Sequence, residues 1–337
     1  MSEAWQYYVI TLLVLYGVNL IAVWSLNFQF GVAGVMNFAF IIFQAIGAYI
    51  GAVLTLGPAE ESGWYQSYIL GMDLVYPLPL LLAAAAGALL ALVLGIIALR
   101  PPHAEYQALV MIVVSAALLL LVSSQKEWFN GTSGIAGVPR PLSEGLGAGT
   151  TAYGWFYVAF TAAVCTLVYL IMHRMTRAPW GRRLRAMRDD PIAASALGVN
   201  VRKEQMVVLM LSGSFAALSG AILVQFVGAW STANWTLTAT FLYFTALIVG
   251  GAGNYAGAAL GVALIWTVLV EAVRYLPTFG RVGLSDMLGN VLIGVLTIAF
   301  LWFRPQGLIP ERRRRLRFAE PTPADNVASS LPSGAAR

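Results

Sequence analysis

The stretch that organises this chain runs from residue 174 to residue 203 and reads RMTRAPWGRRLRAMRDDPIAASALGVNVRK. Long apolar segments flank it on both sides. Eight of its 30 residues are basic: Arg174, Arg177, Arg182, Arg183, Arg185, Arg188, Arg202 and Lys203. Moving one such charge to the centre of a bilayer costs about 2.5–3.5 kcal/mol, so burying all eight would cost more than about 20 kcal/mol. We name residues 174–203 the basic island, and they must lie in water.

The island contains the signal of a short helix. Asp190 suits the N-cap, Pro191 suits the first helical position and Gly198 follows the expected end. A helix over 191–197 would be about 10 Å long. Four apolar residues recur at helical spacing and form one small face: Ile192, Ala193, Ala196 and Leu197. Such a face is suited to a groove on another protein, although a solvated loop with a fortuitous helix is an equal alternative.

We therefore treat one part of the island as a candidate docking segment for a cytoplasmic partner. Its residues are Arg188, Asp189, Asp190, Pro191, Ile192, Ala193, Ala196, Leu197 and Gly198.

The composition indicates a membrane protein. Hydrophobic residues make up 59% of the 337 residues and charged residues only 10%, and the mean hydropathy is +0.76. Soluble domains carry about 25% charged residues. The basic residues behind the net charge of +5 are concentrated in the island and in the segment from Arg304 to Arg317. Both segments are expected in the cytoplasm, so the charge indicates membrane orientation and not nucleic-acid binding. Membrane lipid is an expected partner, and nucleic acid is not.

The fold class that follows is all-α, a polytopic bundle of transmembrane helices. Nine apolar stretches approach the roughly 20 residues needed to cross a bilayer: 6–27, 34–56, 74–99, 105–124, 153–173, 205–228, 237–250, 256–276 and 286–303. Eight or ten crossings are also possible, because short or Gly-interrupted segments can be re-entrant. We expect a single transmembrane domain over 1–310 and a basic, then disordered, cytoplasmic tail over 311–337.

The distribution of lysine and arginine predicts the orientation. With the island inside and nine crossings, the C-terminal tail is also inside and the N-terminus is outside. This arrangement places 16 basic residues inside and 4 outside, as the positive-inside rule requires. The first apolar run follows Glu3 without a preceding basic residue, unlike a secretory signal peptide, so we expect it to be retained as a span.

Two Gly-rich breaks interrupt the apolar segments, GVAGVMNFAF at 31–40 and VGGAGNYAGAALG at 249–261. Broken backbone in a membrane needs protein partners or a water-filled cavity. Close helix packing through small residues explains the glycines equally well. The candidate residues of a translocation path are Gly31, Gly34, Asn37, Gln44, Gly250, Gly251, Gly253 and Asn254.

Motifs of catalysis are missing from the sequence. It has no phosphate-binding loop, and Lys126 and Lys203 are its only lysines. His103 and His173 lie at membrane edges without clusters of cysteines or carboxylates at metal-ligand spacing. We therefore expect no catalytic residue, no metal and no cofactor on this chain. Glu271 is the one convincing intramembrane carboxylate, and an ion pair with Arg274 is more plausible for it than a proton relay.

A bundle of this kind needs an external energy source. Two rival hypotheses need no external energy source of this kind: a secondary transporter that uses Glu271, and a structural membrane protein.

The run WGRRLRAMRDDPIAASALGVNVRKEQMVVLMLSGSFAALSGAIL at 180–223 resembles the signature of the branched-chain amino acid ABC importer permeases, specifically the larger of their two membrane subunits. The similarity continues through LIVGGAGNYAGAALGVAL, VEAVRYLP and FRPQGLIP. At the front, FGVAGVMNFAFIIFQAIGAYIGA is similar to the second span of the family. The resemblance covers about residues 10 to 310.

This resemblance implies an importer in the bacterial cytoplasmic membrane. Its parts would be this chain, a paralogous permease, two ABC ATPase subunits that bind ATP and Mg²⁺, and an extracytoplasmic solute-binding protein. The coupling segment then falls on 181–198. The sequence departs from the family pattern at 36–38 and 102–105, and importers of urea and short-chain amides belong to the same family, so these solutes are alternatives to branched-chain amino acids.

Overall fold

The computed structural model describes residues 3–58, 66–100, 104–142, 150–269, 271–272, 284–304 and 306–311. Several residues that the sequence singles out lie outside these ranges: His103, Arg274 and the tail from 312 onward.

The described chain is almost entirely helical. Its first helix, α1 (Glu3–Leu26), continues into the π-helical turn η1 (Asn27–Val32). The other α-helices are α2 (Phe40–Thr55), α3 (Leu78–Ala98), α4 (Ala104–Ser124), α5 (Lys126–Phe129), α7 (Thr151–Arg177), α8 (Pro179–Asp189), α9 (Pro191–Ala196), α10 (Val201–Val227), α11 (Leu237–Gly250), α12 (Tyr255–Val262) and α14 (Leu284–Phe303). Short elements are η2 (Gly131–Ser133), η3 (Thr232–Asn234), the π-helix η4 (Ala263–Leu269), β1 (Ile135–Ala136) and β2 (Ala229–Trp230).

Each of the nine predicted apolar stretches contains a helix, although residues 34–39 and 74–77 lie outside the helices. Five helical segments are long and apolar enough to cross a membrane: Glu3–Val32, Leu78–Ala98, Glu105–Ser124, Thr151–Arg177 and Val201–Val227. Four shorter apolar helices account for the rest: Phe40–Thr55, Leu237–Gly250, Tyr255–Leu269 and Val291–Phe303. The all-helical class is confirmed, and the number of crossings stays a prediction.

Some boundaries differ from the sequence expectation. α2 begins at Phe40 and not at residue 34, because Gly34 adopts a positive φ of 74° that ends the preceding helical turn. The loop after α4 is not a plain connector, since β1 pairs with β2 in a small antiparallel sheet. The island contains α8 in addition to the expected short helix.

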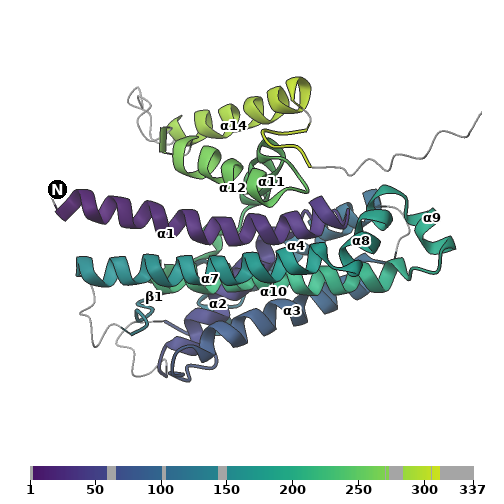
Figure 1. Cartoon of the computed structure of the whole chain (residues 1–337). Helices are drawn as coiled ribbons and strands as arrows, with labels where there is room; N and C mark the ends of the chain where they lie inside the picture. The colour runs from purple at the N-terminus through teal and green to yellow at the C-terminus, as the bar shows by residue number, and fades with distance from the viewer. Residues whose placement is uncertain are drawn as a thin grey trace, which may run out of the picture.

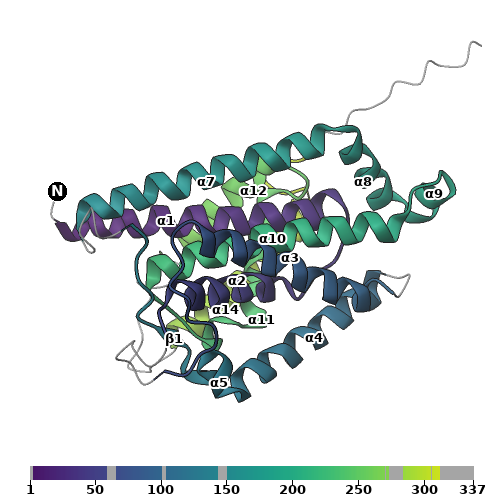
Figure 2. The ribbon, with the colours of Figure 1, turned by 90° about the horizontal axis from the view of Figure 1, so that it is seen from below.

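The helices are arranged around α1 (Figure 1). α11, α12 and α14 lie on one side of it, and α7, α10, α2 and α3 lie on the other, with α4 at the outer edge in the view from below (Figure 2). The centre of the second group is held by small residues. A Cβ atom at Gly47 would lie 1.9 Å from the Ala217 carbonyl oxygen, and one at Gly87 would lie 2.5 Å from the Gly213 carbonyl oxygen. Glycine thus allows direct backbone contact between helices.

The candidate docking segment lies at one end of this bundle. α1 and α7 run in the same direction, because Gly154 contacts Ile10 and Gly17 contacts Thr161. α9 projects from the end of the molecule opposite to the start of α1 (Figures 1 and 2). We name that end, which carries the basic island, the island end. The N-terminal residues and the island therefore lie at opposite ends, as the sequence predicts for opposite sides of a membrane.

Close backbone packing of α10 on α2 makes a testable prediction about stability. Alanine at residue 220 would place its Cβ 1.9 Å from the Gln44 carbonyl oxygen, whereas Gly294 of α14 has no atom within 4 Å of that position. We expect Gly220→Ala to destabilise the purified chain by about 1–3 kcal/mol through overpacking. The matched control Gly294→Ala should not lower the melting temperature. Equal melting temperatures for the two variants would contradict this packing.

Candidate functional site

The short helix expected in the island is present as α9. The Asp190 carboxylate caps its start by accepting hydrogen bonds from the backbone N–H groups of Ile192 at 2.9 Å and Ala193 at 3.0 Å. Pro191 occupies the first turn, and Gly198 follows the end with a φ of 86°. The helix signal is confirmed, although α9 ends at Ala196, one residue before the expected end.

The apolar face of α9 is uncovered. The exposed fractions are 80% for Ile192 and 85% for Leu197, while Ala194 on the other side of the helix is only 3% exposed. Ala193 and Ala196 are also exposed. Large apolar side chains at the tip of a water-exposed projection are typical of a protein interaction surface. We name Ile192, Ala193, Ala196 and Leu197 the α9 face.

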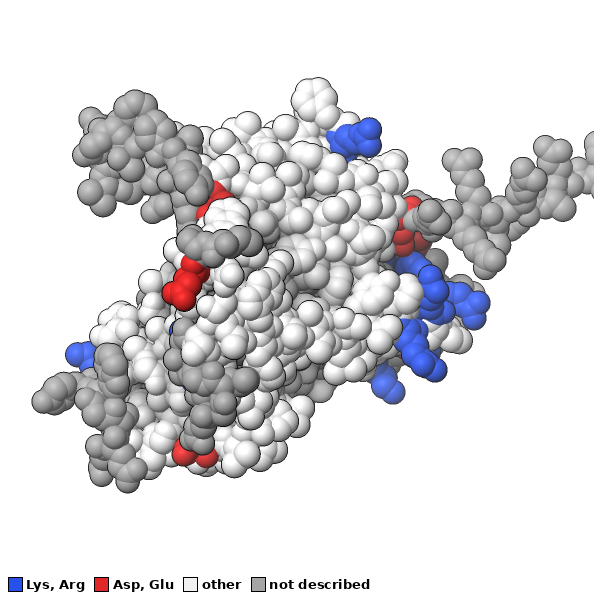
Figure 3. Space-filling view, turned by 60° about the vertical axis from the view of Figure 1, so that its left-hand side comes forward, with Lys and Arg blue, Asp and Glu red and all other residues white. Residues whose placement is uncertain are grey.

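α8 connects this face to the membrane bundle and was missed by sequence reasoning. Its inner side buries Leu184 and Met187, and its outer side exposes Arg182 and Arg183. In Figure 3 the basic side chains gather on the right-hand side of the visible surface, while most of the described surface beside them carries no charge. The sequence did contain the signal for α8, because Pro179 stands at a favoured first position and Leu184 and Met187 are three residues apart.

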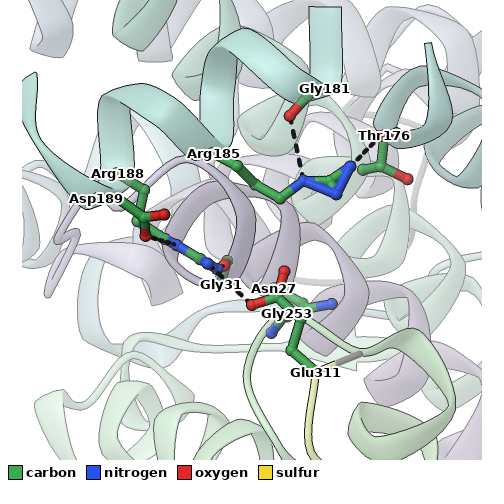
Figure 4. Close-up of polar contacts among 9 residues, drawn as sticks. All are labelled: Asn27, Gly31, Thr176, Gly181, Arg185, Arg188, Asp189, Gly253 and Glu311. Atoms are coloured by element: carbon green, nitrogen blue, oxygen red, sulfur yellow. Dashed lines mark hydrogen bonds and ion pairs between the residues drawn. The ribbon is translucent and has the colours of Figure 1, made fainter. Parts of the chain in front are cut away.

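Arg188 lies apart from the α9 face, although the sequence grouped them together. Its side chain is only 18% exposed and points into the bundle (Figure 4). Its Nη1 donates to the Gly31 carbonyl oxygen, and its Nη2 donates to Oε2 of Glu311 at 2.9 Å. The carboxylate of the neighbouring Asp189 lies 3.5 Å from its Nε.

The two Gly-rich breaks meet at this arginine. Oδ1 of Asn27 accepts a hydrogen bond of 2.7 Å from the Gly253 N–H, and a Cβ at Gly31 would lie 2.5 Å from the same nitrogen. We name Asn27, Gly31, Arg188, Gly253 and Glu311 the junction (Figure 4). It joins η1, α8, the turn between α11 and α12, and the segment after α14.

Gly34 packs directly against Arg188 of the junction, where a larger residue would not fit. A Cβ at this position would lie 2.8 Å from Cγ of Arg188, and its φ of 74° disfavours any side chain. The island and the first break are thus in direct contact.

The segment after α14 delivers Glu311 to the junction. Its Leu308 and Ile309 N–H groups donate to the carbonyl oxygens of Val249 at 2.8 Å and Gly250 at 3.1 Å. Gly251 has a φ of 118°, and a Cβ there would lie 2.3 Å from the Ile309 carbonyl oxygen. Sequence reasoning did not give Glu311 a role, because its partner Arg188 is 123 residues away in the chain.

A separate cavity of about 380 Å³ lies between α1, α2, α10 and α11, and it reaches β2. The Tyr243 hydroxyl lies 2.7 Å from Oε1 of Gln44 and 3.0 Å from Oδ1 of Asn19. Asn234 and Thr236 add polar groups, and the rest of the lining is apolar: Leu15, Ile41, Leu223, Val227, Ala229, Trp230, Ala233, Ala239 and Trp266. The lining residues that the structure describes include no charged side chain. We name this the neutral cavity.

The predicted path residues therefore lie in three places. Gln44 lines the neutral cavity. Gly253 and Asn254 line a second cavity of about 530 Å³ at the island end. The others lie in packed backbone: Gly31 and Gly34 beside Arg188, Gly250 and Gly251 against α12 and residue 309, and Asn37 as a buried residue that accepts from the Ala39 N–H.

The chain is similar in sequence to known transport permeases. A family model described as a branched-chain amino acid transport system permease component matches residues 8–301. The probable branched-chain amino acid transport permease protein LivM of Methanocaldococcus jannaschii is 28% identical over 333 residues, which cover 89% of this chain and 93% of that protein. The high-affinity branched-chain amino acid transport system permease protein LivM of Escherichia coli is 28% identical over 315 residues, which cover 87% of this chain and 68% of that protein.

More distant relatives have names that refer to other solutes. The guanosine ABC transporter permease protein NupQ of Bacillus subtilis is 24% identical over 255 residues, which cover 70% of this chain and 76% of that protein. No solved structure gives a significant match. Since the family model spans most of the chain, this protein belongs to the family of branched-chain amino acid transport system permease components.

Proposed function

We propose that this chain is one of two paralogous membrane subunits of an ATP-driven importer, and that it receives mechanical work from ATPase subunits through α9. The uncovered α9 face carries this proposal. A short apolar helix that projects into water and connects to the bundle through α8 is suited to a groove on a soluble partner. ATP and Mg²⁺ would bind to two such ATPases, and this chain would bind no cofactor and perform no catalysis.

The orientation follows from the same proposal. The island end, with α9 and residues 304–311, faces the cytoplasm of a bacterial cell, and the N-terminal end faces outward. The extracytoplasmic solute-binding protein would then dock at the opposite end, where β1 and β2 lie. Residues 1–310 form the permease domain, and 311–337 form its cytoplasmic tail.

The junction is the route by which movement of α9 reaches the membrane. α8 ends at Asp189, so it carries Arg188 in its last turn and is followed directly by Asp190, the cap residue of α9. A shift of α8 therefore pulls on η1 through Gly31 and on the segment after α14 through Glu311. Packed elements of this kind move as rigid bodies between discrete arrangements.

The lining of the neutral cavity is suited to an uncharged or zwitterionic solute with an apolar side chain. Gln44, Asn19 and Tyr243 offer polar contacts, and tryptophan and aliphatic side chains offer apolar surface. Branched-chain amino acids have this chemistry, and the LivM relatives bear their name. A secondary transporter based on Glu271 is less favoured, because the chain belongs to a transport-system permease family and the Glu271 carboxylate accepts a hydrogen bond from Tyr8 at 3.2 Å.

The α9 face can be tested by charge insertion. Ala193→Arg with Ala196→Arg should abolish solute uptake and ATPase stimulation in the reconstituted transporter, because two charges would be forced into an apolar groove. Membrane insertion should be unchanged. Ser195→Arg is the matched control, since it adds a charge to the same helix outside the apolar arc. Normal uptake by the double variant would rule out coupling through α9.

The junction predicts a loss of coupling on removal of its ion pair. Arg188→Gln or Glu311→Gln breaks a largely buried contact worth about 1.5–3 kcal/mol, so solute imported per ATP hydrolysed should fall about tenfold or more. The two substitutions combined should cost less than the sum of their separate effects. Arg183→Gln removes an ion pair with Glu204 in which Arg183 is 56% exposed, and it should leave the ratio nearly unchanged. Additive effects at 188 and 311 would contradict direct coupling.

The neutral cavity predicts substrate-dependent protection. In a Cys165→Ala background, cysteines introduced at Ala233 and Ala239 should react with a water-soluble thiol reagent, and leucine should slow the reaction in the assembled transporter. Ser133→Cys is the control, because residue 133 is exposed outside the cavity. Protection by urea or acetamide, but not by leucine, would assign the transporter to the amide-importing alternative.

A further inference from the structure

The cavity of about 530 Å³ at the island end has no ligand in the mechanism proposed above, although Gly253 and Glu311 of the junction are part of its lining. It lies between α7, α8, α12 and the segment after α14. Its lining includes Arg177, Arg185, His173, Tyr169 and Glu311. A cavity of this size with charged side chains in its lining, at the end of a membrane bundle, is suited to a charged ligand.

The charge of this cavity is positive. The Glu311 carboxylate is neutralised by Arg188 at 2.9 Å. Arg185 donates to the carbonyl oxygens of Thr176 at 2.6 Å and Gly181 at 3.4 Å, so its guanidinium is held in place by neutral groups (Figure 4). Arg177 is exposed and makes no ion pair within the part of the chain that the structure describes. Two arginine charges therefore remain for an anionic ligand.

An exposed apolar strip on α7 runs toward Arg177, one of the residues that line the cavity. Its exposed residues are Leu167 at 57%, Leu170 at 55% and Ile171 at 37%. Residues 167, 170, 174 and 177 follow at helical spacing, so this strip of α7 changes from leucine to arginine toward the island end. On a membrane-spanning helix the leucine part would lie against acyl chains, and the arginine part would lie at the head-group level.

Aromatic side chains form the boundary between these two parts. Tyr169 stacks on His173 with ring centroids 5.1 Å apart, and Trp24 of α1 lies 5.3 Å from Tyr169. The Trp24 indole N–H donates to the Tyr255 carbonyl oxygen at 2.9 Å. Amphipathic rings of this kind are enriched where hydrocarbon meets head groups.

We propose that this cavity binds the phosphate of an anionic phospholipid from the leaflet at the island end. Arg177 and Arg185 contact the head group, and one acyl chain lies along Leu170 and Leu167. The continuous apolar strip favours a lipid over a free phosphate ion, because a free ion would use only the arginine end. This inference does not depend on which solute the transporter carries or on the role of α9.

Lipid binding can be measured directly on the purified full-length chain. Native mass spectrometry with added phosphatidylglycerol should show a bound lipid, and Arg177→Gln with Arg185→Gln should weaken its affinity about thirtyfold. Arg177→Gln alone should weaken it about fivefold, and this variant removes no described contact of the folded chain. Arg182→Gln with Arg202→Gln is the control, because both arginines are exposed in the island but neither lines the cavity. Unchanged affinity in the Arg177 variant would overturn the proposal.

Two further measurements identify the chemical source of the anion. Phosphatidylcholine should bind at least tenfold more weakly, since its head group has no net charge, and equal binding would overturn an anionic-lipid site. Inorganic phosphate in excess should not displace phosphatidylglycerol, and displacement with equal affinity would assign the cavity to a free ion instead.

Phosphatidylglycerol brominated on its acyl chain should quench tryptophan fluorescence, and Trp24→Phe should reduce that quenching. The same quenching without Trp24 would place the lipid elsewhere.

Discussion

The guanidinium of Arg188 connects three elements at the island end of this protein: α8, η1 and the segment after α14. The ends of helices leave backbone carbonyls without intrahelical partners, and Gly31 presents one of them to this side chain. The same guanidinium pairs with Glu311, and only 18% of the Arg188 side chain is exposed. Removing one partner would leave a largely buried charge uncompensated, which is strongly destabilising. α8 is therefore fixed to the first helix and to the C-terminal segment at once.

The bundle separates the place where force would be applied from the place where a solute would bind. The α9 face, the junction and the arginine-lined cavity lie at the island end, whereas the neutral cavity extends toward β2. Between them, glycines on α2, α3 and α10 bring backbones into contact. Close contact of this kind transmits displacement because packed interiors have low compressibility. The geometry thus fits a subunit that is driven from one end and selects its solute in the other half.

Sequence reasoning succeeded where the signal was local. The Asp190 cap and Pro191 specified α9, and the length and hydropathy of the apolar runs specified the long helices. It missed α8, because alternating arginines hide a helix that buries only a few side chains, among them Leu184 and Met187. It also grouped Arg188 with the α9 face on the basis of adjacency, although the extended Asp190 between the two helices turns their side chains in different directions.

The sequence by itself determined that this chain is a helical membrane protein, where its short exposed helix begins, and which family motifs it carries. Those properties depend on hydropathy and on capping groups within a few residues. Only the tertiary structure decided that the two glycine-rich breaks meet, where Gly31 lies against Gly253, which also bonds to Asn27, 226 residues away in the chain. It also decided that Glu311 completes their contact with α8. Such meetings depend on how helices pack across the whole bundle, and no local pattern encodes them.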